Sequence, residues 1–287
     1  MGSISSPFGF YSEQMQKRGM IMKFSSLHTH TTYSDGKGSI RENIESAIRK
    51  NFVSLGISDH SYTACDESYC MMLSDYDDYE REVKELKKEY EGRMPLFLGL
   101  EKDYYSDVDK ERYDYIISSV HYIIKDGICY PIDHSKAQQE ECIRDAFGGN
   151  VLDMAKHYYS MVVEAAEKCR PDIIGHFDVL NKFGVMPEND EAYRKIVLEA
   201  TREAAKYTRF FEVNTGAISR GYRTIPYPSD YVLEELNSLG MPLVLTSDCH
   251  HPDNLDYAYD LSVPIIKNSG YTKIYNLTEN GFKEFDL

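Results

Sequence analysis

The chain has 287 residues, of which 42% are hydrophobic and 28% are charged. This composition is ordinary for a globular protein, and a chain of this length buries enough apolar surface to fold without disulfide bonds. Its net charge of −15 argues against a general affinity for the nucleic-acid backbone and suits a small or cationic substrate better. No apolar run approaches the roughly 20 residues that span a bilayer, so we expect neither a nucleic-acid nor a membrane partner.

The cysteines are scattered along the chain, without a CxxC pair and without a secretory leader in front of them. There are six: Cys65, Cys70, Cys129, Cys142, Cys169 and Cys249. Because cytoplasmic proteins keep their thiols reduced, this pattern favours a cytoplasmic location. The oligomeric state stays open at this point.

Residues 1–22 are rich in Ser, Gly and Met and lack apolar periodicity, and Met20 and Met22 are both alternative internal starts. We interpret this segment as an N-terminal extension or an expression remnant, and residues 23–287 as the folded domain. No Gly-, Pro- or Ser-rich linker divides those residues, so we predict a single domain.

From residue 24 onward, short β-branched or aromatic runs alternate with longer polar helical patterns, which is typical of βα units and a parallel sheet. Seven strands are predicted, over residues 24–30, 53–60, 95–104, 114–123, 172–178, 210–215 and 242–250. Helices are predicted over residues 39–51, 75–91, 151–169 and 188–207. The first of these helices opens with a capping box, in which Glu42 follows Ser39 by three residues.

Histidines gather at the ends of these predicted strands. Six of the nine lie at or near the C-terminal ends of five strands: His28, His30, His60, His121, His176 and His250. In parallel α/β barrels, active sites are built on that face. Several carboxylates lie in the same places: Asp35, Asp59, Glu101, Asp178 and Asp248. Imidazoles and carboxylates are the groups that bind divalent transition metals, so this pattern predicts a metal site.

The spacing within the strands supports this prediction. His28 and His30 are two residues apart, as are Asp248 and His250, and side chains at positions i and i+2 of a strand project to one face. Closure of a barrel makes the first and last strands neighbours, so these four side chains should share one site. We expect Asp59 and Asp178 to accept hydrogen bonds from ligand imidazoles rather than to bind metal themselves.

Six short motifs, in a fixed order, resemble those of the polymerase and histidinol phosphatase (PHP) family. They are LHTHTTYSDG (27–36), SDHS (58–61), GLEKDY (99–104), SSVHYI (118–123), GHFD (175–178) and TSDCH (246–250). The resemblance extends from about residue 24 to residue 249 and beyond, and it implies a distorted (β/α)7 barrel. The seven predicted strands agree with that fold. Within the family, EVNTGAISR (212–220) looks most like the histidinol-phosphate phosphatases.

The resemblance also implies three divalent metal ions. The first would be held by His28, His30, Glu101 and Asp248, the second by Glu101, His121 and His176, and the third by Asp35, His60 and His250. Glu101 would bridge the first two ions and act as a catalytic residue. Family members often have a histidine where this chain has Asp35. These ligands serve Zn, Mn and Fe alike, so the identity of the metal stays open.

The activity implied by the resemblance is hydrolysis of a phosphomonoester, L-histidinol phosphate, to L-histidinol and phosphate in histidine biosynthesis. A metal-bound hydroxide would be the nucleophile. The sequence has no GxSxG elbow that would indicate a serine nucleophile. Two alternatives remain: a PHP phosphoesterase acting on nucleotides or short oligonucleotides, and a PHP module that binds metal without catalysis. The proton donor to the leaving group is not identified.

Phosphate also needs cationic partners, and Arg220 and Arg223 lie just past the sixth predicted strand on the same barrel face. The planar guanidinium suits phosphate oxygens, and we prefer Arg220 as the catalytic phosphate ligand, with Arg223 as the alternative. His134 is a further candidate for substrate binding. Acidic loop residues are candidates for contacting the substrate amine: Asp66, Glu67 and Asp133.

Overall fold

The computed structural model describes residues 24–287, so the predicted N-terminal extension lies outside the described residues. Seven parallel strands form one sheet, in the order β1-β2-β3-β4-β7-β8-β9. They are β1 (Ser25–Ser26), β2 (Ser54–Ile57), β3 (Leu96–Asp103), β4 (Tyr115–Ser119), β7 (Ile173–Ile174), β8 (Phe210–Asn214) and β9 (Leu243–Thr246). Each lies within one of the seven predicted ranges.

The two edges of this sheet meet just beyond β1 and β9. Thr29 and Cys249 form a parallel bridge, in which the amide of His30 donates to Cys249 O at 2.8 Å and the amide of Cys249 donates to His28 O at 3.0 Å. These bonds bring the two edge strands together at their C-terminal ends. The prediction of a distorted (β/α)7 barrel is therefore confirmed.

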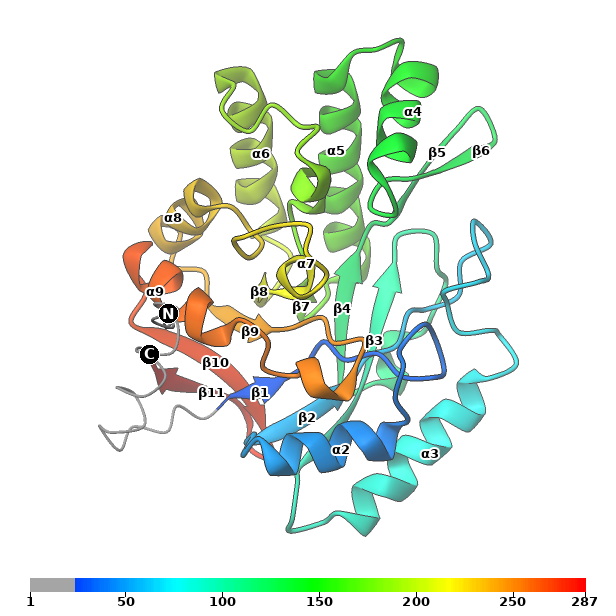
Figure 1. Cartoon of the computed structure of the whole chain (residues 1–287), viewed down its shortest axis with the longest axis vertical. Helices are drawn as coiled ribbons and strands as arrows, with labels where there is room; N and C mark the ends of the chain where they lie inside the picture. Colours follow the sequence, from blue (N-terminus) through cyan, green and yellow to red (C-terminus); the bar gives the residue numbers. More distant parts are fainter. Residues whose placement is uncertain (1–23) are drawn as a thin grey trace, which may run out of the picture.

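Helices surround the strands in Figure 1. They are α2 (Ile40–Arg49), α3 (Tyr76–Glu89), α4 (Lys136–Phe147), α5 (Val151–Cys169), α6 (Glu191–Ala204), α7 (Gly216–Ser219), α8 (Asp230–Ser238) and α9 (Tyr259–Asn268). The four predicted helices correspond to α2, α3, α5 and α6. The capping box of α2 is present: the Ser39 hydroxyl accepts from the amide of Glu42, and the Glu42 carboxylate accepts from the amide of Ser39.

The fourth predicted strand is wrong in its second half. β4 ends at Ser119, and the residues after His121 form β5 (Tyr122–Lys125), which pairs antiparallel with β6 (Ile128–Pro131). Asp126 and Gly127 connect them with φ of 53° and 78°, the left-handed backbone that a two-residue hairpin turn requires. A second hairpin, β10 (Lys273–Thr278) and β11 (Gly281–Asp286), was also not predicted.

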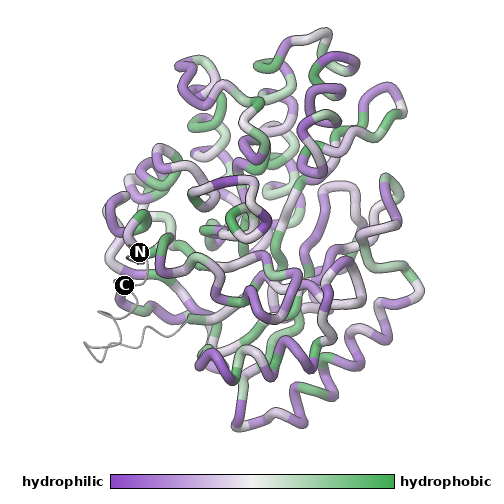
Figure 2. The backbone as a smooth tube through the Cα atoms, in the orientation of Figure 1, coloured by the Kyte–Doolittle hydropathy of each residue, from purple (hydrophilic) through white to green (hydrophobic). Residues whose placement is uncertain are grey.

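Apolar side chains form two clusters. The larger lies between the strands and the surrounding helices, and Figure 2 shows hydrophobic and hydrophilic residues alternating along α2, as expected for a helix with one buried face. The smaller cluster lies inside the barrel and includes Leu277 of β10. Because the Ser54 hydroxyl donates to Leu277 O at 2.6 Å, the C-terminal hairpin is fixed to the start of β2. The hairpin therefore covers the end of the barrel opposite the predicted site.

Tyr115 fills much of the barrel interior. Its hydroxyl donates to Leu27 O at 2.5 Å, which ties β4 to the first strand across the barrel. A Cβ atom on Gly56 or Gly99 would lie 2.1 or 2.2 Å from the Tyr115 side chain, closer than carbon atoms can approach. Glycine at these two positions therefore leaves the space that the tyrosine ring occupies.

Cys65 and Cys129 form a disulfide bond, although they are 64 residues apart in the sequence. Nothing in the spacing of the cysteines predicts this pair. It links the segment between β2 and α3 to the β5–β6 hairpin, and both of these segments lie beside the predicted site. Within residues 24–287, the remaining four cysteines are free, and no helix is long and apolar enough to cross a membrane.

Candidate metal centre

The structure brings all nine predicted metal ligands together at the C-terminal end of the barrel. β1, β2, β4, β7 and β9 each end shortly before one or more of them, and Glu101 lies within β3. The set is His28, His30, Asp35, His60, Glu101, His121, His176, Asp248 and His250. Seven of the nine are buried, and Asp35 and His250 are half-buried at the rim.

The Glu101 carboxylate is at the centre of this cluster. Its Oε2 lies 3.2 Å from His28 Nε2, 3.6 Å from His30 Nε2 and 2.7 Å from His60 Nδ1, and its Oε1 lies 3.4 Å from His121 Nε2 and 2.9 Å from His176 Nε2. Burial alone would raise its pKa, but the surrounding imidazoles outweigh burial and hold the pKa of Glu101 well below its usual range. The carboxylate is therefore ionised, as a ligand must be.

Four groups within the cluster have ligand atoms close enough together to hold an ion. They are His28–His30–Asp248, His28–Glu101–His176, His60–Glu101–His121 and His30–Asp35–His60–His250. The first contains three of the four ligands predicted for one ion. The last contains the three ligands predicted for another ion and adds His30. Four residues each occur in two groups, so neighbouring ions would share ligands: His28, His30, His60 and Glu101.

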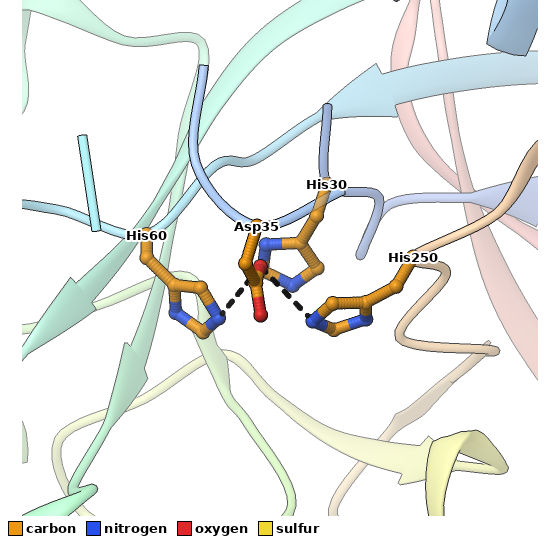
Figure 3. Close-up of side chains that lie close together, drawn as sticks. All are labelled: His30, Asp35, His60 and His250. Carbon is orange, nitrogen blue, oxygen red and sulfur yellow. Dashed lines mark ion pairs between the residues drawn. The ribbon is translucent and has the colours of Figure 1, made fainter. Parts of the chain in front are cut away.

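Figure 3 shows the group at the rim, where Asp35 points between two imidazoles. Asp35 Oδ1 lies 3.2 Å from His250 Nε2 and 3.7 Å from His60 Nε2. Burial opposes ionisation, but these imidazoles outweigh it and lower the pKa of the Asp35 carboxyl. Burial together with the neighbouring imidazoles of His250 and His60 holds the pKa of His30 well below its usual range, so this imidazole is neutral.

Several side-chain nitrogen and oxygen atoms of the predicted ligands are buried without a hydrogen-bond partner among the described residues. They are His28 Nε2, both ring nitrogens of His30, Asp35 Oδ1, Glu101 Oε2 and His176 Nδ1. Burying a polar atom unpaired costs about 1–3 kcal/mol, and here six such atoms lie in one cluster. A divalent cation accepts the lone pairs of such atoms, so the residues present fit bound metal.

Glu212 orients the first ligand, and its role was not predicted. Its Oε1 lies 2.6 Å from His28 Nδ1, which leaves His28 Nε2 facing the cluster. Glu212 also accepts from the amide of His176 at 2.7 Å and from the Thr246 hydroxyl. It is a carboxylate within a barrel strand, as Glu101 is, and that position was the signal that could have identified it.

Asp59 and Asp178 do not have the role predicted for them. Asp59 accepts from the amide and hydroxyl of Thr31 and from the Ser34 hydroxyl, so it fixes the loop that carries Asp35 instead of orienting an imidazole. Asp178 accepts from the amide and hydroxyl of Ser229. For Asp59, the alternation of side chains explains the difference, because this residue is adjacent to the inward-facing His60 and points to the other face. Asp178 lies beyond the end of β7, where strand alternation no longer applies.

Asp103 orients the imidazole of His121. Its Oδ2 lies 3.2 Å from both the amide nitrogen and Nδ1 of His121. Burial disfavours the imidazolium, but Glu101 and Asp103 outweigh it and raise the pKa of His121 well above its usual value. Asp103 follows Glu101 by two residues on β3, so both carboxylates face the site.

Arg220 lies at the edge of the cluster, whereas Arg223 does not. Arg220 Nη2 donates to Asp248 Oδ2 at 2.9 Å, and Nη1 lies 3.1 Å from His250 Nδ1. Arg223 donates to Asn181 O at 2.7 Å and pairs with Glu188 at 3.3 Å. Its guanidinium is committed to these partners, so the structure does not support Arg223 as a substrate ligand.

A cavity of about 240 Å³ opens above the cluster and contains Arg220. His134, Asp66 and Asp133 also line it, as does Lys182, a cation that was not predicted. Four tyrosines complete the wall: Tyr69, Tyr122, Tyr222 and Tyr227. Glu67 is not part of the cavity wall, and its carboxylate accepts from the Tyr62 hydroxyl at 2.8 Å. The cavity therefore combines a metal-binding floor with cationic, acidic and aromatic side walls.

A barrel with histidines and carboxylates clustered at its strand ends defines an α/β-barrel protein with a candidate metal centre. Residues 26–216 match the PHP domain family. The chain belongs to this family, as its motifs indicate.

Known proteins of similar sequence are named histidinol-phosphatases. The histidinol-phosphatase of Bacillus subtilis is 26% identical over 272 residues, covering 86% of this chain and 98% of that one. A protein of Deinococcus radiodurans, named "Probable histidinol-phosphatase", is 29% identical over 254 residues, covering 85% and 92%. The same name is given to a Schizosaccharomyces pombe protein that is 24% identical and covers 87% and 88%.

A solved structure with the same fold comes from Lactococcus lactis. It is a histidinol phosphate phosphatase in complex with Zn, L-histidinol and phosphate, with a TM-score of 0.67 and 17% identity. The similarity covers 91% of this chain and 99% of that chain. At this level of identity, the comparison establishes the shared fold.

Proposed function

We propose that this protein is a metal-dependent phosphomonoesterase that hydrolyses L-histidinol phosphate to L-histidinol and phosphate. The observation that carries the proposal is the cluster of nine predicted ligands, five of which have buried atoms without a hydrogen-bond partner among the described residues, directly below a cavity that holds Arg220. The names of the three relatives, and the L-histidinol and phosphate bound to the Lactococcus lactis protein, support this substrate.

The cluster would hold three divalent ions, with the ligand sets implied by the family motifs. Zn is bound in the Lactococcus lactis protein, and Mn and Fe accept the same ligand types. When bound, divalent ions polarise the phosphoryl group and make water a nucleophile near neutral pH. Glu101 holds five imidazoles around one carboxylate and would bridge two of the ions.

Arg220 would bind and orient the phosphoryl group. Burial opposes its charge, but Asp248 outweighs burial and raises the pKa of the guanidinium, so Arg220 is cationic at any pH of interest. One of its nitrogens already bonds to the Asp248 carboxylate, which fixes the plane of the guanidinium beside the cluster. A fixed guanidinium loses little freedom when a phosphoryl oxygen binds it.

The side walls would select the organic part of the substrate. Asp66 and Asp133 line the cavity and offer carboxylates for a protonated amine, whereas Glu67 does not reach it. Burial opposes ionisation of Asp133, but Lys182 and His121 outweigh burial and lower its pKa. His134, exposed at the mouth, is positioned for contact with the imidazole or for proton transfer.

The reaction would be the step of histidine biosynthesis that yields histidinol, and we place it in the cytoplasm. Four of the six cysteines are free thiols, as in most cytoplasmic proteins, and the Cys65–Cys129 pair is the exception.

A comparison of substrates tests the proposal. We expect kcat/KM of the metal-replete protein for L-histidinol phosphate to exceed that for AMP, a dinucleotide or an aryl phosphate by at least about 100-fold. Two satisfied charge-assisted contacts to the amine and imidazole account for a factor of this size. A higher kcat/KM for a nucleotide would favour the phosphoesterase alternative. No hydrolysis of any phosphoester would favour a non-catalytic PHP module.

Arg220→Ala should lower kcat/KM for every phosphomonoester by about 10- to 100-fold, because one charge-assisted contact to the phosphoryl group is lost. Arg223→Ala is the matched control. Its side chain is 7% exposed and pairs with Glu188, so its removal should lower the melting temperature and leave kcat/KM of the folded enzyme unchanged. Metal analysis of both variants distinguishes lost phosphate binding from lost metal. Similar kinetic effects of the two substitutions would contradict the assignment.

A further inference from the structure

Tyr69 lies in the segment between β2 and α3, against the predicted metal ligands. Its ring is perpendicular to that of His60 at 4.8 Å between centroids, and it lies 6.1 Å from the ring of His121. On its other side, it stacks on Tyr122 at 6.0 Å. The ring is thereby fixed between the imidazole cluster and the β5–β6 hairpin, and it forms part of the cavity wall.

The hydroxyl of Tyr69 is screened from solvent and has no hydrogen-bond partner among residues 24–287. A buried hydroxyl without a partner lowers the stability of the fold by about 1–3 kcal/mol. A ligand that accepts a hydrogen bond from the hydroxyl removes this penalty. The hydroxyl is therefore available as a donor to an anion bound in the cavity.

Tyr69 and Arg220 contact different parts of the cluster. Arg220 bonds to Asp248 and His250, whereas Tyr69 packs on His60 and His121. A phosphoryl group held above the cluster would lie between them. The Tyr227 hydroxyl, which also lines this cavity, likewise has no partner in the part of the chain that the structure describes, but its ring lies farther from the imidazoles, at 6.5 Å from His176.

The segment that carries Tyr69 is anchored at both ends. Cys65, four residues before it, is bonded to Cys129 of β6, and the amide of Met71, two residues after it, donates to His60 O at 3.0 Å. A donor held in place before the substrate arrives positions the reacting group at a lower entropic cost.

We propose that the Tyr69 hydroxyl donates a hydrogen bond to a phosphoryl oxygen of the substrate, opposite Arg220. This inference rests on the proposed phosphatase function and adds a residue that its motifs do not contain. The contact is made to the phosphoryl group and not to the organic part of the substrate, so it should serve every phosphomonoester equally.

The test is Tyr69→Phe, which removes the hydroxyl and keeps the ring. The matched control is Tyr62→Phe, whose hydroxyl bonds to Glu67 outside the cavity. We expect Tyr69→Phe to lower kcat/KM about 10- to 100-fold for both L-histidinol phosphate and an aryl phosphate, and to weaken inhibition by inorganic phosphate. Metal content and melting temperature should match those of the control.

Three results would overturn the proposal. Unchanged kinetics would mean that the hydroxyl has no role in the reaction. A loss confined to L-histidinol phosphate would assign it to the organic part of the substrate. A loss of bound metal would make Tyr69 a structural support for His60 and His121. If L-histidinol phosphate is not the natural substrate, the aryl phosphate and inorganic phosphate measurements still test Tyr69, so the two failures are distinguishable.

Discussion

Exhaustive chelation is expected to abolish phosphatase activity, and addition of Zn, Mn or Fe to the chelated protein is expected to restore it. The cluster consists of imidazoles and carboxylates, the groups that hold divalent metal, and bound metal would make water a nucleophile near neutral pH. Metal ions contribute several kcal/mol of transition-state stabilisation, which corresponds to at least about 1,000-fold in rate. Elemental analysis of the active protein should find up to three ions per chain.

The measurement needs activity and metal content from the same samples. Protein dialysed against chelator, protein with metal restored and untreated protein would be assayed in parallel, and circular dichroism would show whether the chelated protein remains folded. Full activity in a sample shown to contain no metal would contradict the proposed mechanism.

The same experiment has an expected pH dependence. Burial disfavours the imidazolium of His28, but Glu212, Glu101 and Asp248 outweigh it and raise its pKa well above the usual value. A raised pKa means that, without metal, the imidazole holds its proton to a higher pH than a free histidine does. Metal must displace that proton, so uptake should release protons and should weaken as pH falls. Calorimetric titration in two buffers of different ionisation enthalpy measures the release.

The strands and their ligands were predictable because both follow local rules. His28 and His30 face one side since strand side chains alternate, and His121 and His176 reach the same site because parallel strands end on one face. These rules depend on sequence spacing alone. They place histidines and carboxylates at one end of the barrel before the order of the strands is known, and the resemblance to the family motifs then selects nine of them as ligands.

Features that depend on distant contacts were not predictable in this way. Glu212 orients His28 across 184 residues of sequence, and Cys65 meets Cys129 across 64. Arg223 lies only three residues from Arg220, yet it turns toward Glu188 because the intervening Gly221 has φ of 76° and redirects the backbone. The partners in each case are brought together by the packing of elements, which spacing does not describe.

Glu101→Gln is expected to cause the largest loss of any single substitution in the cluster, about 1,000-fold or more in kcat. The substitution keeps the size of the side chain and removes its charge. Glu101 is 1% exposed and lies within 3.6 Å of five imidazole nitrogens, so no water or neighbouring group can replace the carboxylate. Loss of a carboxylate shared by two ions should remove or displace both, each of which contributes several kcal/mol.

Asp35→Asn is the matched comparison, because it makes the same chemical change at the rim of the cluster. Its side chain is 33% exposed, and within residues 24–287 it forms ion pairs with His60 and His250 only, so solvent can replace a lost ligand. We expect a loss of about 10- to 100-fold, with one ion weakened rather than two. Steady-state kinetics and metal content of both variants decide between the two positions. Equal and mild losses would mean that Glu101 does not bridge two ions.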